Sequence, residues 1–178
     1  MNRLAPKPSS DAARPAAWLP VFSIASALLI LDRVTKYLIT SVLFEGQSIP
    51  VIPDIFHLTL VLNKGIAFGL FKGRQYFFIL LSGLAILSIA AYLWRRRRVG
   101  ARLSLALGLI LGGALGNVID RVRLGHVIDF LDFRVWPVFN VADSAITIGA
   151  VLLAWNVLRH PPLKLRRMPA YGSMAGKD

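Results

Sequence analysis

The order of apolar and charged residues along the chain predicts four membrane-spanning helices. Residues 76–94 form an uncharged run of 19, and residues 103–119 form an uncharged run of 17. At ~1.5 Å of rise per residue, a helix of that length nearly crosses a hydrocarbon core of ~30 Å. Two further segments, 16–44 and 135–158, are mostly apolar. The first carries Asp32, Arg33 and Lys36, and the second carries Asp143.

The segment between the first two spans, residues 47–71, has a different pattern. Residues 55–62 alternate with a period of two and include β-branched side chains, which is typical of a strand. An open strand cannot leave its backbone unpaired in lipid, so it has to pair with itself, pair with a substrate or lie in the interface. We therefore expect an α-helical integral membrane protein of four helices, with a small extracytoplasmic β-like segment between helices 1 and 2.

Basic residues set the orientation of these spans. Thirteen lie in the two tails and in the connection after the second span, whereas six lie in the other two connections. Because cytoplasmic segments carry the excess of Lys and Arg, both termini are predicted to be cytoplasmic. The four arginines at 95–98 are interpreted as a topology anchor and not as a nucleic-acid site.

Composition agrees with a membrane protein. The chain is 56% hydrophobic and 17% charged, against roughly 25% charged residues in a typical soluble domain. Its net charge of +12 does not indicate a nucleic-acid partner, because the basic residues lie between apolar runs. The absence of cysteine excludes disulfides, thiolate metal sites and cysteine nucleophiles. Three scattered histidines lead us to expect no metal and no cofactor.

Acidic residues near the spans are the candidates for chemistry, since a charge in a membrane costs roughly 2.5 to 3.5 kcal/mol. The predicted topology brings four of them to the outer face: Asp120, Asp129, Asp132 and Asp143. Two carboxylates held close together share one proton, which supplies an acid and a base to activate water. From the spacing alone, pairing of these aspartates with the arginines at 121, 123 and 134 is at least as good an interpretation.

Five sequence blocks change this balance. They read LDRVTK at 31–36, NKGIAFG at 63–69, GGALGNVIDR at 112–121, GHVIDF at 125–130 and FNVADSA at 139–145. Together, and in this order, they resemble the signature blocks of the lipoprotein signal peptidase (signal peptidase II) family. The resemblance covers residues 16–158, the expected four-helix membrane peptidase domain, and leaves cytoplasmic basic tails at 1–15 and 159–178.

The resemblance implies an aspartic endopeptidase of the bacterial cytoplasmic (inner) membrane, with its active site towards the outer face. Such an enzyme removes signal peptides from diacylglyceryl-modified prolipoproteins and cuts before the lipidated cysteine. The blocks place the catalytic pair on Asp129 and Asp143 and give Asp120 a structural pairing role. The implied partners are lipid-modified prolipoproteins and membrane lipids, and we expect a monomer.

Other polar positions in these blocks are expected to bind substrate or support the aspartates. They are Asn63, Asn117, Arg121 and Asn140, joined by Asp32 and Lys36, which are four residues apart on one helix face and can pair. Phe68 is expected to pack on the lipid or on the signal sequence. Arg33 replaces a common Gln and His126 a common Tyr, but neither change touches the predicted pair.

Two rival functions belong to other classes of membrane protein. A small transporter would bind a proton or cation at Asp32 or Asp143, and it predicts internal repeats and midplane polar groups. A scaffold protein would use Gly108, Gly112 and Gly116 as packing positions alone. Neither accounts for aspartates that converge on one face.

Overall fold

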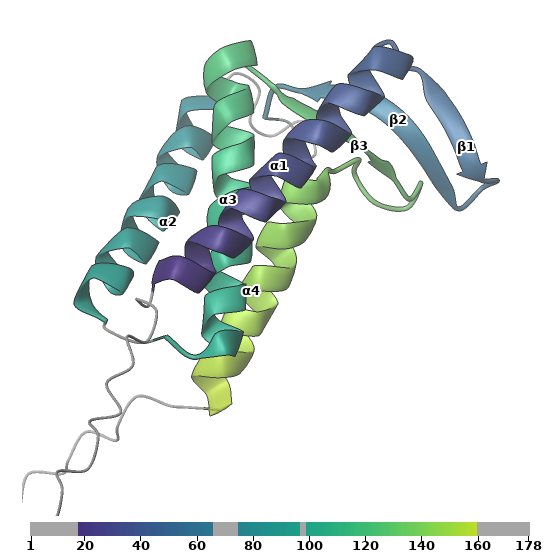
Figure 1. Ribbon diagram of the computed structural model, residues 1–178. Coiled ribbons are helices and arrows are strands. Elements are labelled where there is room, and N and C mark those ends of the chain that lie inside the picture. Colours follow the sequence, from purple (N-terminus) through teal and green to yellow (C-terminus); the bar gives the residue numbers. More distant parts are fainter. Residues whose placement is uncertain (1–17, 66–74, 97–98, 160–178) are drawn as a thin grey trace, which may run out of the picture.

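The computed structural model describes residues 18–65, 75–96 and 99–159. It contains α1 (Trp18–Val42), α2 (Gln75–Arg95), α3 (Ala101–Leu124) and α4 (Val141–Arg159), shown in Figure 1. All four helices are long and apolar enough to cross a membrane, so the prediction of four spans is confirmed. The predicted basic tails lie almost entirely outside the described residues.

Two helix boundaries differ from the sequence prediction by five residues or more, and both differences affect where acidic residues lie. α3 continues five residues past 119 and ends where Gly125 adopts φ 76°, with its N–H donating to the Arg121 carbonyl at 3.1 Å. Such a left-handed residue after the last turn suits glycine, which has no Cβ to clash. α4 begins six residues later than predicted, because Phe139 first pairs with Leu131.

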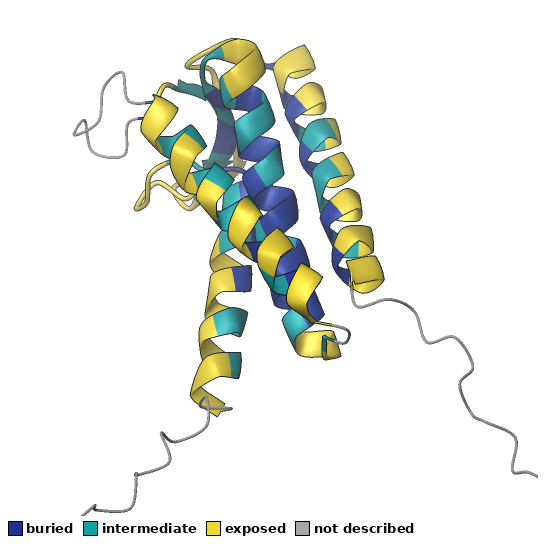
Figure 2. Cartoon of the chain, turned by 90° about the vertical axis from the view of Figure 1, so that its left-hand side faces the viewer, coloured by how far each residue is buried: buried dark blue, intermediate teal, exposed yellow. Residues whose placement is uncertain are grey.

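α3 is the centre of the bundle and contacts the other three helices. Figure 2 shows it mostly buried, whereas α1, α2 and α4 present exposed apolar faces on their outer sides. Glycines allow the close approach: a Cβ on Gly112 would lie 2.7 Å from the Ala25 carbonyl oxygen of α1. A Cβ on Gly113 would lie 2.5 Å from the Ala142 carbonyl oxygen of α4. Small residues therefore set the distances between these helices.

Gly112→Ala should lower thermal stability, while Gly83→Ala should leave it unchanged or raise it slightly. A Cβ at Gly83 in α2 has nothing within 4 Å, so alanine there gains roughly 0.5–1 kcal/mol of helix propensity. At Gly112 the new methyl meets α1 backbone, and overpacking costs roughly 1–3 kcal/mol. Thermal unfolding of both variants in detergent measures this difference. A Gly112→Ala protein as stable as Gly83→Ala would contradict the packing described.

A three-stranded antiparallel sheet lies at the end of the bundle where α1 ends and α4 begins (Figure 1). Its strands are β1 (Ser48–Ile52), β2 (Phe56–Asn63) and β3 (Val127–Asp132), in the order β1-β2-β3. The predicted β-like segment is confirmed as β1 and β2. β3, from the connection between α3 and α4, was not predicted from the sequence.

Apolar side chains fix this sheet on the helices. Leu60 and Phe130 of the sheet form a buried cluster with Ile39 and Leu43 at the end of α1. The register then places Asp129 opposite Val61 of β2. The position of Asp129 is thus determined by strand pairing on one side and by helix packing on the other.

Candidate functional site

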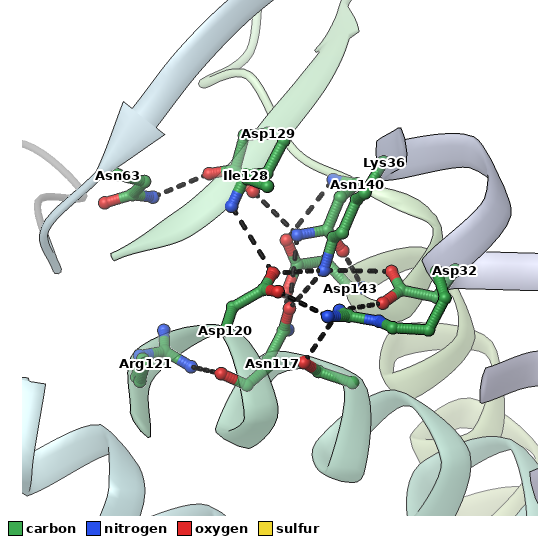
Figure 3. A network of polar contacts seen from close by, with 12 residues as sticks. Asp32, Lys36, Asn63, Asn117, Asp120, Arg121, Ile128, Asp129, Asn140 and Asp143 are labelled. Carbon is green, nitrogen blue, oxygen red and sulfur yellow. Dashed lines mark hydrogen bonds and ion pairs between the residues drawn. The ribbon is translucent and has the colours of Figure 1, made fainter. Parts of the chain in front are cut away.

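Asp129 and Asp143 belong to one hydrogen-bonded network where β3 meets α3 and α4 (Figure 3). Asn140 joins them: its Nδ2 donates to Asp129 Oδ1 at 2.7 Å, and its backbone N–H donates to Asp143 Oδ2 at 3.3 Å. The second oxygen of each carboxylate also accepts from an amide. Asn63 Nδ2 donates to Asp129 Oδ2 at 2.8 Å, and Asn117 Nδ2 donates to Asp143 Oδ1 at 2.7 Å.

The start of α4 explains how a short stretch of sequence positions two of these groups. The Asp143 N–H donates to Asn140 Oδ1 at 2.9 Å, while the Asn140 N–H returns a bond to the Asp143 carboxylate. This reciprocal pattern is a capping box, made here by Asn and Asp. A carboxylate in the first turn of a helix is also favoured by the positive end of the helix dipole.

The alternative, that the outer aspartates pair with nearby arginines, applies to only some of them. Asp132 pairs with Arg134 at 3.2 Å. Asp120 pairs not with its neighbour Arg121 but with α1, through Arg33 at 2.6 Å and Lys36 at 2.7 Å. Within the ranges that the structure describes, Asp129 and Asp143 form no ion pair with Lys or Arg.

The two aspartates of β3 differ in their electrostatic environment. Asp129 is 1% exposed, and this burial, together with the charge of Asp143, raises its pKa from 3.8 to about 7. Hydrogen bonds from Asn63 and Asn140 oppose the increase. Burial also acts to raise the pKa of Asp132, but hydrogen bonds from Thr59 and Arg134 outweigh it and lower that pKa. Asp129 is therefore the carboxyl of β3 that can hold a proton near neutral pH.

The raised pKa of Asp129 predicts the direction in which the stability of the fold changes with pH, and thermal unfolding measures that change. Between pH 3.8 and about 7 the folded protein holds a proton on Asp129 that the unfolded chain releases, so this group lowers stability as the pH rises. Asp129→Asn removes the titration. The melting temperature of the variant minus that of the wild type should thus increase between about pH 5 and about pH 8. A constant or decreasing difference would show that Asp129 is not protonated preferentially in the fold.

Behind the two aspartates lies a cluster of four charges, Asp32, Arg33, Lys36 and Asp120. Lys36 Nζ lies 3.0 Å from Asp32 Oδ1, the ion pair that their spacing predicts, and 2.7 Å from Asp120 Oδ2. Arg33 lies 2.6 Å from the other oxygen of each carboxylate. Both carboxylates are fully buried. Each negative charge is therefore compensated by two cations, which is what buried ions need.

Lys36 connects this four-charge cluster to the aspartates. Its Nζ donates to Asn117 Oδ1 at 3.3 Å, and Asn140 Nδ2 donates to the same oxygen at 3.2 Å. An amide oxygen that faces two donors fixes the orientation of the whole side chain. The Asn117 NH₂ group consequently points at Asp143.

Sequence reasoning missed Arg33, which was noted only as a departure at a position where Gln is common. The available signal was a charge within an apolar span, which calls for a partner. Of the other predicted residues, Arg121 Nη1 donates to the Asn117 carbonyl at 3.4 Å, and its guanidinium lies 5.1 Å from the centre of the Phe78 ring. Phe68 lies outside the described residues.

Comparisons with known proteins agree on one family. The sequence profile of signal peptidase (SPase) II matches residues 24–159. The lipoprotein signal peptidase of Halothermothrix orenii is 47% identical over 133 residues, 75% of this chain and 91% of that protein. The one from Janthinobacterium sp. is 45% identical over 148 residues, covering 79% and 89%.

Solved structures give the same result. A bacterial membrane enzyme determined at 2.3 Å superposes with a TM-score of 0.74 at 31% identity, covering 84% of this chain and 98% of its own. A second, at 1.9 Å, gives a TM-score of 0.73 at 33% identity and covers 82% and 97%. With its four spans and matching fold, this chain belongs to the signal peptidase II family of lipoprotein signal peptidases.

Proposed function

We propose that this peptidase hydrolyses diacylglyceryl-modified prolipoproteins just before the lipidated cysteine, with Asp129 and Asp143 as its catalytic residues. The observation that carries the proposal is the shared network. The buried carboxyl of Asp129 in β3 and the half-buried carboxyl of Asp143 in α4 are joined through Asn140, and neither forms an ion pair among the described residues. A membrane peptidase needs an acid and a base to activate water. Of the other described aspartates, Asp32, Asp120 and Asp132 are ion-paired, and Asp54 is exposed in the turn between β1 and β2.

The two aspartates take different roles. Asp143, at the positive end of α4 and bonded by two N–H donors, is the carboxylate that removes a proton from water. Asp129, whose pKa is about 7, donates its proton to the scissile carbonyl oxygen as the hydroxide attacks. When the tetrahedral intermediate collapses, the C–N bond breaks and the proton gained by Asp143 passes to the leaving amine. One hydroxyl of the intermediate returns its proton to Asp129 as the C=O bond re-forms.

Cleavage of a lipidated substrate tests this function directly. Purified protein is incubated with a prolipoprotein peptide that carries diacylglyceryl on its cysteine, and mass spectrometry identifies the new termini. The proposal expects a free amino group on the lipidated cysteine, with EDTA present throughout. Cleavage at another bond, or activity that requires added zinc, would contradict it.

We propose further that this multi-pass protein lies in the bacterial inner membrane as a monomer, with both termini cytoplasmic and the aspartates near the outer face. Every group of the site comes from one chain. Thirteen Lys and Arg residues lie in the two tails and around the connection between α2 and α3, whereas six lie between α1 and α2 or between the last turn of α3 and α4. An excess of basic residues marks the cytoplasmic side.

Single cysteines test this orientation, because the chain has none of its own. Glu45→Cys, next to the sheet, should react with an impermeant maleimide in cells whose outer membrane is permeabilised. Gly100→Cys, in the connection between α2 and α3, should react only after the inner membrane is lysed. The reverse labelling pattern would overturn the orientation.

A further inference from the structure

A cavity of about 520 Å³ opens beside Asp143. One wall is aromatic and comes from the connection between β3 and α4: Phe133, Trp136 and Phe139. The other wall is a face of α4, formed by Asp143, Ser144, Thr147 and Ile148. These seven residues define the α4 pocket. Its volume lies within the ~300–1,000 Å³ of sites that bind small molecules.

The polar side chains of the α4 pocket have little to offer a peptide. Ser144 Oγ donates to the Asn140 carbonyl at 3.0 Å, and Thr147 Oγ1 donates to the Asp143 carbonyl at 2.9 Å. Both hydroxyl protons are therefore used within α4 itself. A peptide backbone needs donors and acceptors for its own N–H and C=O groups. The α4 pocket, apart from Asp143, presents mainly hydrocarbon and aromatic surface.

The pocket continues along α4 into the apolar outer surface. Ile148 is 54% exposed, Val151 is 64% exposed and Trp155 is 52% exposed. Their spacing of three and four residues places them on adjoining parts of one helix face. A hydrocarbon chain that enters beside Asp143 can thus run along α4 and stay within the bilayer.

Amide and cationic groups lie towards α3 and the end of β2. Asn63 donates to Asp129 (Figure 3), and Arg121 lies over Phe78 of α2. The two aspartates are thus placed between an amide-rich region and the hydrophobic α4 pocket. A substrate that has peptide on one side of its scissile bond and lipid on the other matches this difference in polarity between the two regions.

We infer that the α4 pocket binds the glyceryl and the first acyl carbons of the lipid on the residue that follows the scissile bond, with the acyl chains running along α4. This inference rests on the proposed function and assigns one part of the substrate to one part of the site. The lipid is then recognised because its hydrocarbon is buried next to Asp143, where contact with apolar side chains is more favourable than contact with water.

Photo-labelling locates the lipid directly. The probe is a prolipoprotein peptide with a diazirine on the acyl carbons nearest the glyceryl group, bound to full-length Asp129→Asn protein and mapped by mass spectrometry. We expect labels within residues 133–148. A second probe carries the diazirine on the side chain before the scissile bond and should label elsewhere. Labels from the second probe in the α4 pocket, or from the first on α1 or α2, would overturn the assignment.

Filling the pocket gives an independent kinetic test. Ile148→Trp should raise KM for the diacyl substrate about tenfold or more and change kcat much less, whereas Ile30→Trp, 64% exposed on α1, should change neither. If the Ile148→Trp protein does not fold, Thr147→Trp is measured in its place. If the wild type cleaves the substrate but the pocket-filling variant and Ile30→Trp have equal KM values, the inference is overturned. No cleavage by the wild type would instead contradict the proposed function.

Discussion

Asp129→Asn and Asp143→Asn should each lower kcat by at least ~10²- to 10⁴-fold while leaving a folded protein. Asparagine matches the size of aspartate but neither accepts nor donates the proton that hydrolysis moves. Because one residue acts as base and the other as acid, neither can replace the other. The double variant should therefore be about as inactive as each single variant, as expected for residues that act as a unit.

Asp54→Asn is the matched control for these two substitutions. Asp54 is an exposed aspartate in the turn between β1 and β2, with φ 61°, a conformation that asparagine also tolerates. It removes the same charge from the same end of the molecule. Initial rates with the lipidated peptide are compared at equal amounts of folded protein. A well-folded Asp129→Asn enzyme with rates close to those of Asp54→Asn would remove Asp129 from the mechanism.

Lys36→Met should be the most destabilising substitution in the bundle. Lys36 is 2% exposed and compensates Asp32 and Asp120 while it orients Asn117. Its loss leaves two buried carboxylates with Arg33 alone, and breaking a buried pair in this way costs roughly 3–5 kcal/mol. We expect a large fall in melting temperature, and lower kcat in whatever protein remains folded.

Two further variants separate the effect of Lys36 on charge balance from its effect on the orientation of Asn117. The double variant Asp32→Asn/Lys36→Met restores neutrality and should recover part of the stability but not the orientation of Asn117, so kcat should stay low. Arg123→Met removes an exposed cation from the last turn of α3 and should change little. Recovery of both stability and kcat in the double variant would show that Lys36 acts through charge balance alone.

The sequence was informative wherever a local pattern determines structure. Hydropathy located the four helices, because a helix that crosses the hydrocarbon core has to consist mostly of apolar residues over that length. β3 was missed because Asp129 and Asp132 interrupt its apolar positions, so that it is a strand only through its pairing with β2. Strand pairing across 68 residues, as between Val61 and Asp129, has no local signal.

The same distinction applies to the site. Spacing predicted the pair of Asp32 and Lys36 because both lie on one helix. Spacing could not predict that Arg33 reaches Asp120, 87 residues away, since that contact depends on how closely α1 approaches α3. The approach is set by glycines such as Gly116, where a Cβ would lie 2.7 Å from Asp32 Oδ2.

The capping box at the start of α4 decides which inactive protein is best for trapping a bound substrate. Asp143 caps the start of α4 as well as facing the cavity. An asparagine there therefore weakens the cap and can change the structure of the site that the trapped complex is used to study. Asp129 caps no helix. A stalled complex prepared with Asp129→Asn should therefore preserve the resting shape of the reaction chamber more faithfully than one prepared with Asp143→Asn.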